Sequence, residues 1–263
     1  MADKRLPEFE HTISNGSRVL QELINVAKAN KLNVPHEGLK DLKGIVLIHS
    51  HKGAAVVGWE QGNGAAFKVL GEDADGTPVL SAPIPMLLQK FTVGLQLGYN
   101  SVFTMLAIYD DIVFDDMVRV DTAGMVMGKD IVLTGLQDID TSTAANTYHS
   151  TSVHSMPADA AEAKVLKHTK PVRAITVSES FMVIDVSLYG GSLAVDVEKL
   201  VGVYGGGATV PQVLHGTVPM PAALVGPVAG LGKELAALRQ AVDRSALFMQ
   251  QANAEAAKLY SLS

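Results

Sequence analysis

The sequence of 263 residues contains no cysteine. This absence excludes disulfide bonds, zinc sites and iron–sulfur clusters held by thiolates, and a cysteine nucleophile. It is consistent with a reducing compartment. A chain of this length forms one large domain, or a domain with an appendage, and its hydrophobic core needs neither a disulfide nor a metal to hold it together.

Long hydrophobic runs and an excess of cations are also missing. No run approaches about 18 uninterrupted apolar residues, so the sequence predicts no membrane-spanning helix. The net charge of -6 argues against general nucleic-acid binding, which needs a cationic surface. The N-terminus has no apolar signal segment, and Ala2 stands where N-myristoylation requires glycine. We therefore expect a cytoplasmic protein, peripheral to membranes at most, with no nucleic-acid partner.

The motifs of the common enzyme classes are absent as well. No serine lies in a G-x-S-x-G elbow. The segment from Gly124 to Lys129 has too few residues between its glycines for a P-loop. The Gly62-Asn-Gly64 segment lacks the third glycine and the following helix of a dinucleotide site. We expect no enzymatic activity and no cofactor.

Two groups of polar residues carry side chains that can bind a metal ion. His49 and His51 share one face of a predicted strand, but the spacing supplies no third ligand. The aspartate-rich segment 110–121 lacks the spacing and the glycine of an EF-hand. It predicts a short helix with a solvated acidic face and with Ile112, Val113 and Met117 pointing inward. No metal site is expected.

The most informative stretch runs from Leu39 to Gly98. Short apolar and β-branched runs alternate there with closely spaced glycines, which is typical of strands with bulges, sharp bends or closely approaching backbones. The pattern predicts a tightly bent antiparallel sheet. We expect a hairpin turn between AAVVGWE and AAFKV in which Gly62 or Gly64 holds a positive φ.

Helical patterns flank this sheet. An amphipathic helix is predicted over residues 17–31, with Ser17 as its N-cap. The predicted units are a domain over residues 1–214, a glycine- and proline-rich strap over 215–230 and a helix over 231–263. The fold class is therefore α+β: a bent antiparallel sheet or partial barrel with an N-terminal amphipathic helix and a long C-terminal helix.

The predicted C-terminal helix carries an apolar seam whose members are spaced alternately by four and three residues, as in a heptad repeat. Two interpretations remain open: the helix packs on its own domain, or it binds a partner helix or a second copy. The candidate partner-binding residues are Leu231, Leu235, Leu238, Val242, Met249 and Leu259.

An ordered set of segments carries a family resemblance. In chain order they are KGIVLIHSHKGAAVVGWEQGNGAAFKV, SAP, VGLQLGY, MLAIYDD, IVLTGL and FMVIDVSLYGG. This set resembles the SYLF domain, a lipid-binding module also linked to actin, over residues 17 to 214. Leu80 and Phe103 stand where the family usually has Trp and Asp, and Asp185 and Tyr189 where it tends to have Gly and Glu.

The resemblance implies a non-catalytic adaptor that associates with anionic lipid or phosphoinositide and with the cytoskeleton, so anionic lipid and actin are the expected partners. In the family, the amphipathic start of the domain is the part associated with membranes. The candidate lipid-binding residues are the cations of this region: Lys4, Arg5, Arg18, Lys28, Lys31, Lys40 and Lys43. The alternative is a scaffold subunit of a larger assembly that keeps the fold without lipid binding and contacts another protein through the C-terminal helix.

Overall fold

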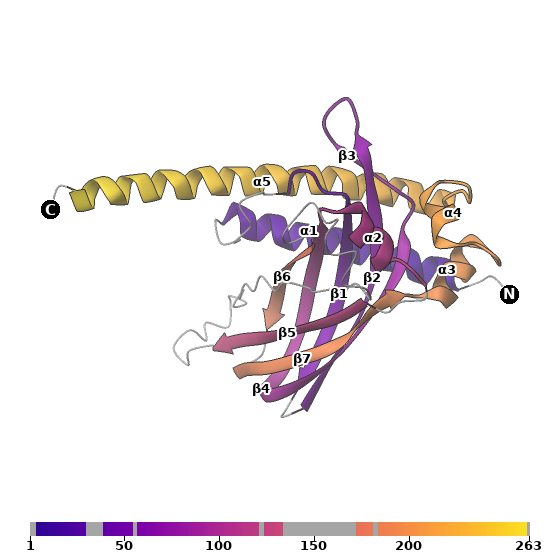
Figure 1. Cartoon of the computed structure of the whole chain (residues 1–263), viewed down its shortest axis with the longest axis horizontal. Helices are drawn as coiled ribbons and strands as arrows, with labels where there is room; N and C mark the ends of the chain where they lie inside the picture. The colour runs from indigo at the N-terminus through magenta and orange to yellow at the C-terminus, as the bar shows by residue number, and fades with distance from the viewer. Residues whose placement is uncertain are drawn as a thin grey trace.

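The computed structural model describes residues 4–29, 39–54, 57–120, 124–133, 172–180 and 184–261. Over these residues the chain has the predicted α+β fold, with helices packed on an antiparallel sheet of seven strands (Figure 1). The bent sheet, the N-terminal helix and the long C-terminal helix are confirmed. The sheet is open and does not close into a barrel.

The strands are β1 (Gly44–Ala54), β2 (Val57–Glu72), β3 (Pro78–Leu80), β4 (Ile84–Ile108), β5 (Gly124–Leu133), β6 (Val172–Ser180) and β7 (Ile184–Val195). The helices are α1 (Arg5–Lys28), α2 (Asp111–Met117), α3 (Val197–Tyr204), α4 (Val210–Leu214) and α5 (Ala222–Ser261).

Strand β4 bends around the hairpin formed by β1 and β2. Its residues 84–93 pair with β2, and its residues 98–108 pair with β1. Because β1 and β2 also pair with each other, residues 94–97 must pass around the tip of the hairpin. Strand β7 then extends the sheet beside the first half of β4, and β6 extends it beside the second half.

Gly62 and Gly64 lie within β2 and not in a turn. Neither is among the glycines with positive φ, so the predicted hairpin turn is wrong. The connection between β1 and β2 is residues 55–56, which lie outside the described part of the chain. A Cβ on Gly62 would come 2.5 Å from the Cβ of Ser50, and one on Gly64 would come 2.5 Å from the carbonyl oxygen of Leu47. Both positions need glycine because the neighbouring strand approaches closely.

The two faces of the sheet bury separate apolar clusters. On β1, Ile45 and Leu47 pack under α1 and α5, while Val46 and Ile48 point to the opposite side and pack with α2, α3 and α4. This alternation follows from the two-residue period of a strand. We call the side under α1 and α5 the helix face and the other side the opposite face.

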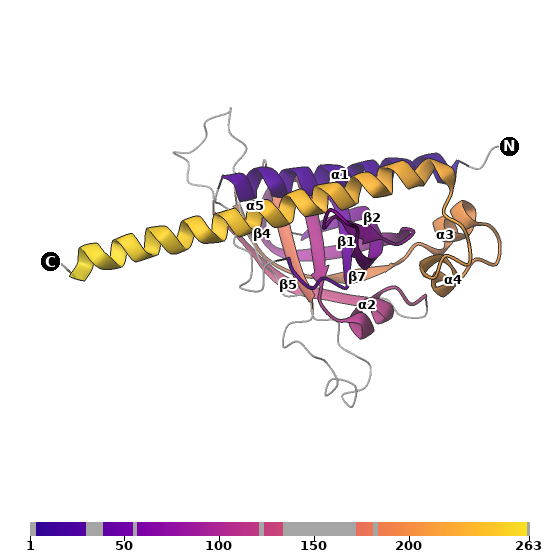
Figure 2. The ribbon, with the colours of Figure 1, turned by 90° about the horizontal axis from the view of Figure 1, so that it is seen from above.

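Helices α1 and α5 lie side by side across the helix face and run in the same direction (Figure 2). Gly16 lets α1 lie close to the sheet, because a Cβ there would come 3.3 Å from the Leu47 side chain. The Ser17 hydroxyl donates to Glu234 of α5 at 2.6 Å. Ser17 lies inside α1, which begins at Arg5, so the prediction that Ser17 caps the helix is wrong.

Helix α5 begins at Ala222, inside the predicted strap. Residues 222–230 are helical although they include Pro227, because Leu224 and Val228 are buried in the core under the helix. Packing of an apolar face stabilises a helix more than intrinsic propensity does. With 40 residues, α5 spans about 60 Å, and its C-terminal end projects beyond the rest of the domain (Figures 1 and 2).

Candidate functional site

The first four residues of the predicted partner-binding seam belong to the core of this chain. Leu231, Leu235, Leu238 and Val242 are at most 5% exposed and pack with α1 and the sheet. They are therefore not available to a partner, and packing on the parent domain is the interpretation that holds for this half of α5. The side chains of Met249 and Leu259 lie outside the described residues.

The described members of the predicted lipid-binding set do not form one cluster. Helix α1, with 24 residues, is about 36 Å long, so cations at its two ends are far apart. The set is distributed with Lys4 and Arg5 at the start of α1, Lys28 in its last turn, Lys40 and Lys43 before β1, and Lys31 outside the described residues. Arg18 differs from these, because it lies against the sheet.

Arg18 begins a continuous row of stacked side chains on the helix face. Its Cζ atom lies 4.9 Å from the ring centre of Phe103, a cation–π contact. Phe103 stacks on His49 with ring centroids 4.8 Å apart, and His49 meets His51 edge to face at 4.7 Å. His51 stacks on Tyr99 at 5.8 Å. We call these five residues the aromatic row; they connect α1 to the tip of the hairpin.

Strand register and hydrogen bonds hold the row in place. His49 pairs across the sheet with Phe103, and His51 pairs with Ser101. His49 Nε2 and Ser101 Oγ share a hydrogen bond of 2.8 Å, and Tyr99 Oη and His51 Nδ1 share one of 2.7 Å. Each imidazole is therefore fixed by one hydrogen bond and one stacking contact.

The electrostatics of the row keep His49 neutral. Burial lowers the pKa of His49 to about 4, together with the positive charges of His51, Arg18 and His11. A buried imidazole resists protonation because the cation loses hydration, and neighbouring cations add repulsion. Among the described residues, no group of three or more His, Cys, Asp or Glu side chains is placed to hold a metal ion.

At the end of the row that Tyr99 forms, the helix face exposes a group of large apolar side chains. They are between 50% and 69% exposed, and we call them the tip patch: Val57, Trp59, Phe91, Val93 and Tyr99. Trp59 pairs with Phe91 across the sheet, and Val57 pairs with Val93. The described side chains of β1, β2 and β4 on this part of the face include no carboxylate. The sequence analysis missed this patch, although its residues alternate along β2 and β4.

A buried polar cluster occupies the opposite face of the same strands. Ser50 donates to Glu60 Oε1 at 2.5 Å, and Lys90 Nζ donates to the two Glu60 oxygens at 3.2 and 3.1 Å. Lys52 is only 2% exposed, and Asn100 pairs with it across the sheet. The Oδ1 atom of Asn100 is buried without a hydrogen-bond partner. Near the hairpin tip, the opposite face is therefore polar, whereas next to α2, α3 and α4 it is apolar.

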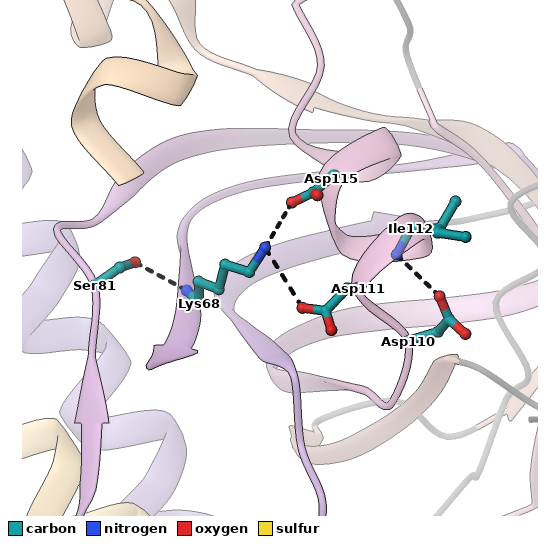
Figure 3. A network of polar contacts seen from close by, with 6 residues as sticks. All are labelled: Lys68, Ser81, Asp110, Asp111, Ile112 and Asp115. Atoms are coloured by element: carbon teal, nitrogen blue, oxygen red, sulfur yellow. Dashed lines mark hydrogen bonds and ion pairs between the residues drawn. The ribbon is translucent and has the colours of Figure 1, made fainter. Parts of the chain in front are cut away.

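A second polar network lies towards the other end of β2 (Figure 3). Lys68 Nζ lies 3.0 Å from Asp115 and 3.4 Å from Asp111 of α2, and the Lys68 amide donates to Ser81 Oγ at 2.9 Å. Burial alone lowers the pKa of Lys68, but the hydrogen bond to Asp115 and the attraction of both carboxylates outweigh it and raise this pKa. The network anchors α2 to the sheet.

Helix α2 forms as predicted with Val113 buried, but Asp110 and Ile112 lie differently from the prediction. Asp110 is buried and caps the helix by accepting a hydrogen bond from the Ile112 amide at 2.9 Å. Ile112 is exposed, although it was predicted to point inward, and Phe114 is buried in its place. Met117 is buried as predicted.

Comparison with known protein families, with curated proteins and with solved structures finds no match to this chain. In the part of the chain that the structure describes, no helix is both long enough and apolar enough to cross a bilayer. The features that bear on function are therefore the tip patch, the aromatic row and the resemblance in the sequence.

Proposed function

We propose that the protein is a non-catalytic, lipid-associated adaptor module that contacts a membrane surface through the tip patch. The observation that carries the proposal is the exposure of Trp59, Phe91 and Tyr99 on one continuous part of the sheet. Tryptophan and tyrosine favour the membrane–water interface, where the apolar ring is buried and the polar group stays hydrated.

The energetics support an apolar contact at this position. Burying a large apolar side chain contributes about 1.5–3 kcal/mol, so insertion of the tip patch releases several kcal/mol against the cost of association. Carboxylates would be repelled by the negative headgroups of an anionic membrane, and the described side chains around the patch include none. Arg18 lies at the inner end of the aromatic row, where it adds a favourable charge.

The proposal keeps the lipid association that the resemblance implies but moves the main contact from the N-terminal cations to the tip of the hairpin. Those cations are spread along α1 and the segment after it, so they offer a weak and diffuse attraction. Contact with actin and selectivity for phosphoinositides stay predictions from the resemblance alone.

Vesicle flotation tests the proposal. A Phe91→Ser, Val93→Ser double variant removes two of the five large apolar side chains of the patch without touching the core, so it should float far less than the wild type. The matched control is Leu70→Ser, which changes an exposed residue near the other end of β2 and should float normally. Equal flotation of the double variant and the wild type would overturn the proposal.

The scaffold alternative is favoured by one observation. The projecting end of α5 exposes Leu247 and Phe248, at 59% and 53%. Truncation after Ser245 removes this end and leaves the buried half of α5 in place. If the truncated protein keeps its melting temperature but loses oligomers or bound proteins, a scaffold function through α5 is supported. If its mass in solution and its bound proteins are unchanged, the alternative fails.

A further inference from the structure

Basic side chains gather where α1 meets the aromatic row. His11 and Arg18 are seven residues apart on α1, which places them on one side of the helix, and both are exposed. His49 and His51 lie on β1 with ring centroids 4.7 Å apart. His11, Arg18 and His51 are close enough to His49 for their charges to oppose its protonation.

Resting on the membrane contact proposed above, we propose that this cluster binds the phosphate groups of an anionic lipid surface together with protons. Each proton added to the free protein is repelled by the positive charges already there. A phosphate group placed against the cluster removes that repulsion, so the imidazoles take up protons on binding. By linkage, binding to anionic lipid must then strengthen as the pH falls.

The position of the cluster fits this function. It adjoins the tip patch on the same face, and lipid phosphates lie at the depth at which tryptophan and tyrosine rings anchor. An apolar contact by the patch therefore brings headgroups to the cluster. Neutral vesicles bind through the tip patch alone, whereas anionic vesicles bind through both the tip patch and the cluster.

Other charged and polar groups face the cluster from each neighbouring element. On α1, Glu8 lies three residues before His11 and Glu22 four residues after Arg18. The groups from the described side chains of the strands are Gln61 and Asn63 on β2 and Ser101 and Tyr99 on β4. Glu8 and Glu22 therefore lie beyond the two ends of the His11–Arg18 segment of α1. Their negative charges reduce the net charge of this side of the helix.

Calorimetric titration with vesicles measures the proton uptake directly. The probe is a phosphatidylcholine vesicle with and without phosphatidylglycerol, whose phosphodiester stays charged across the range from about pH 8 to about pH 5.5 in which imidazoles titrate. Binding enthalpies in buffers of different ionisation enthalpy give the number of protons taken up. We expect net uptake with the anionic vesicles, and an affinity that rises by up to about tenfold per pH unit for each proton.

The variants separate the cluster from the patch. In a His11→Gln, His51→Gln double variant, fewer protons should be taken up and the affinity for anionic vesicles should depend less steeply on pH. Both side chains are exposed, so the melting temperature should change little. The control is His215→Gln, an exposed histidine after α4, which should take up protons like the wild type.

The outcomes distinguish this inference from the proposed function. If the wild type binds neither vesicle at any pH, the membrane contact itself is wrong and both proposals are overturned. If it binds without proton uptake, the contact stands and this inference fails. It also fails if the double variant takes up as many protons as the wild type.

Discussion

His49 lies flat on Phe103, with ring centroids 4.8 Å apart and planes 1° from parallel. Burial, with the nearby positive groups, lowers the pKa of His49 from 6.5 to about 4, so the unfolded chain binds the proton first as the pH falls. The free energy of unfolding should therefore decrease as the pH falls from 6.5 to about 4. Outside this pH range, His49 should not make the free energy of unfolding depend on pH.

Urea unfolding at a series of pH values measures this contribution. A His49→Gln variant removes the titrating group, so its stability should fall less steeply than that of the wild type between these two pH values. His49 is partly exposed, and solvent screening moderates the size of the difference. Parallel profiles for the two proteins would show that His49 is not held neutral by the fold.

Helix α5 offers a matched pair of leucines for testing how it packs. Leu235 is fully buried under the helix, whereas Leu247 lies on its projecting end. Leu235→Ala should reduce the free energy of unfolding by about 2–5 kcal/mol because it leaves a cavity. Leu247→Ala should change it by less than about 0.5 kcal/mol. Denaturant unfolding gives both values, and similar effects at the two positions would contradict the described packing.

The Glu60–Lys90 pair on the opposite face should behave as a buried ion pair. Glu60→Met leaves the Lys90 ammonium without the carboxylate that it contacts at 3.1 Å, and this should cost about 3–5 kcal/mol of stability. A Glu60→Met, Lys90→Met double variant removes both charges and should lose less than the sum of the single variants. Additive losses in a double-mutant cycle would show that the two groups are not coupled.

The sequence predicted the sheet but not the role of its glycines. Alternating apolar runs between Leu39 and Gly98 were enough to identify bent antiparallel strands. A glycine in a turn and a glycine under a neighbouring backbone look the same in sequence, so Gly62 and Gly64 were assigned to a turn. The start of α5 was missed for a related reason, since Pro227 lowers helix propensity and only the packing beneath it offsets that cost.

The candidate site was predictable only in part. The two-residue period of a strand placed His49 and His51 on one face, as the structure has them. The contacts of His49 with Phe103 and of Phe103 with Arg18 join three elements that are distant in the chain, and no spacing encodes such contacts. The tip patch likewise depends on the register that sets Trp59 opposite Phe91.

The central claim is that the tip patch enters a lipid surface, and Trp59 reports on it directly because the sequence contains a single tryptophan. The measurement is Trp59 emission during titration with phosphatidylcholine–phosphatidylglycerol vesicles, some carrying bromine on the acyl chains. Insertion predicts a shift to shorter wavelength and quenching by bromine near the headgroups, both lost in the Phe91→Ser, Val93→Ser variant. Emission that stays at the wavelength of the free protein, unquenched while the protein floats with the vesicles, would contradict the claim.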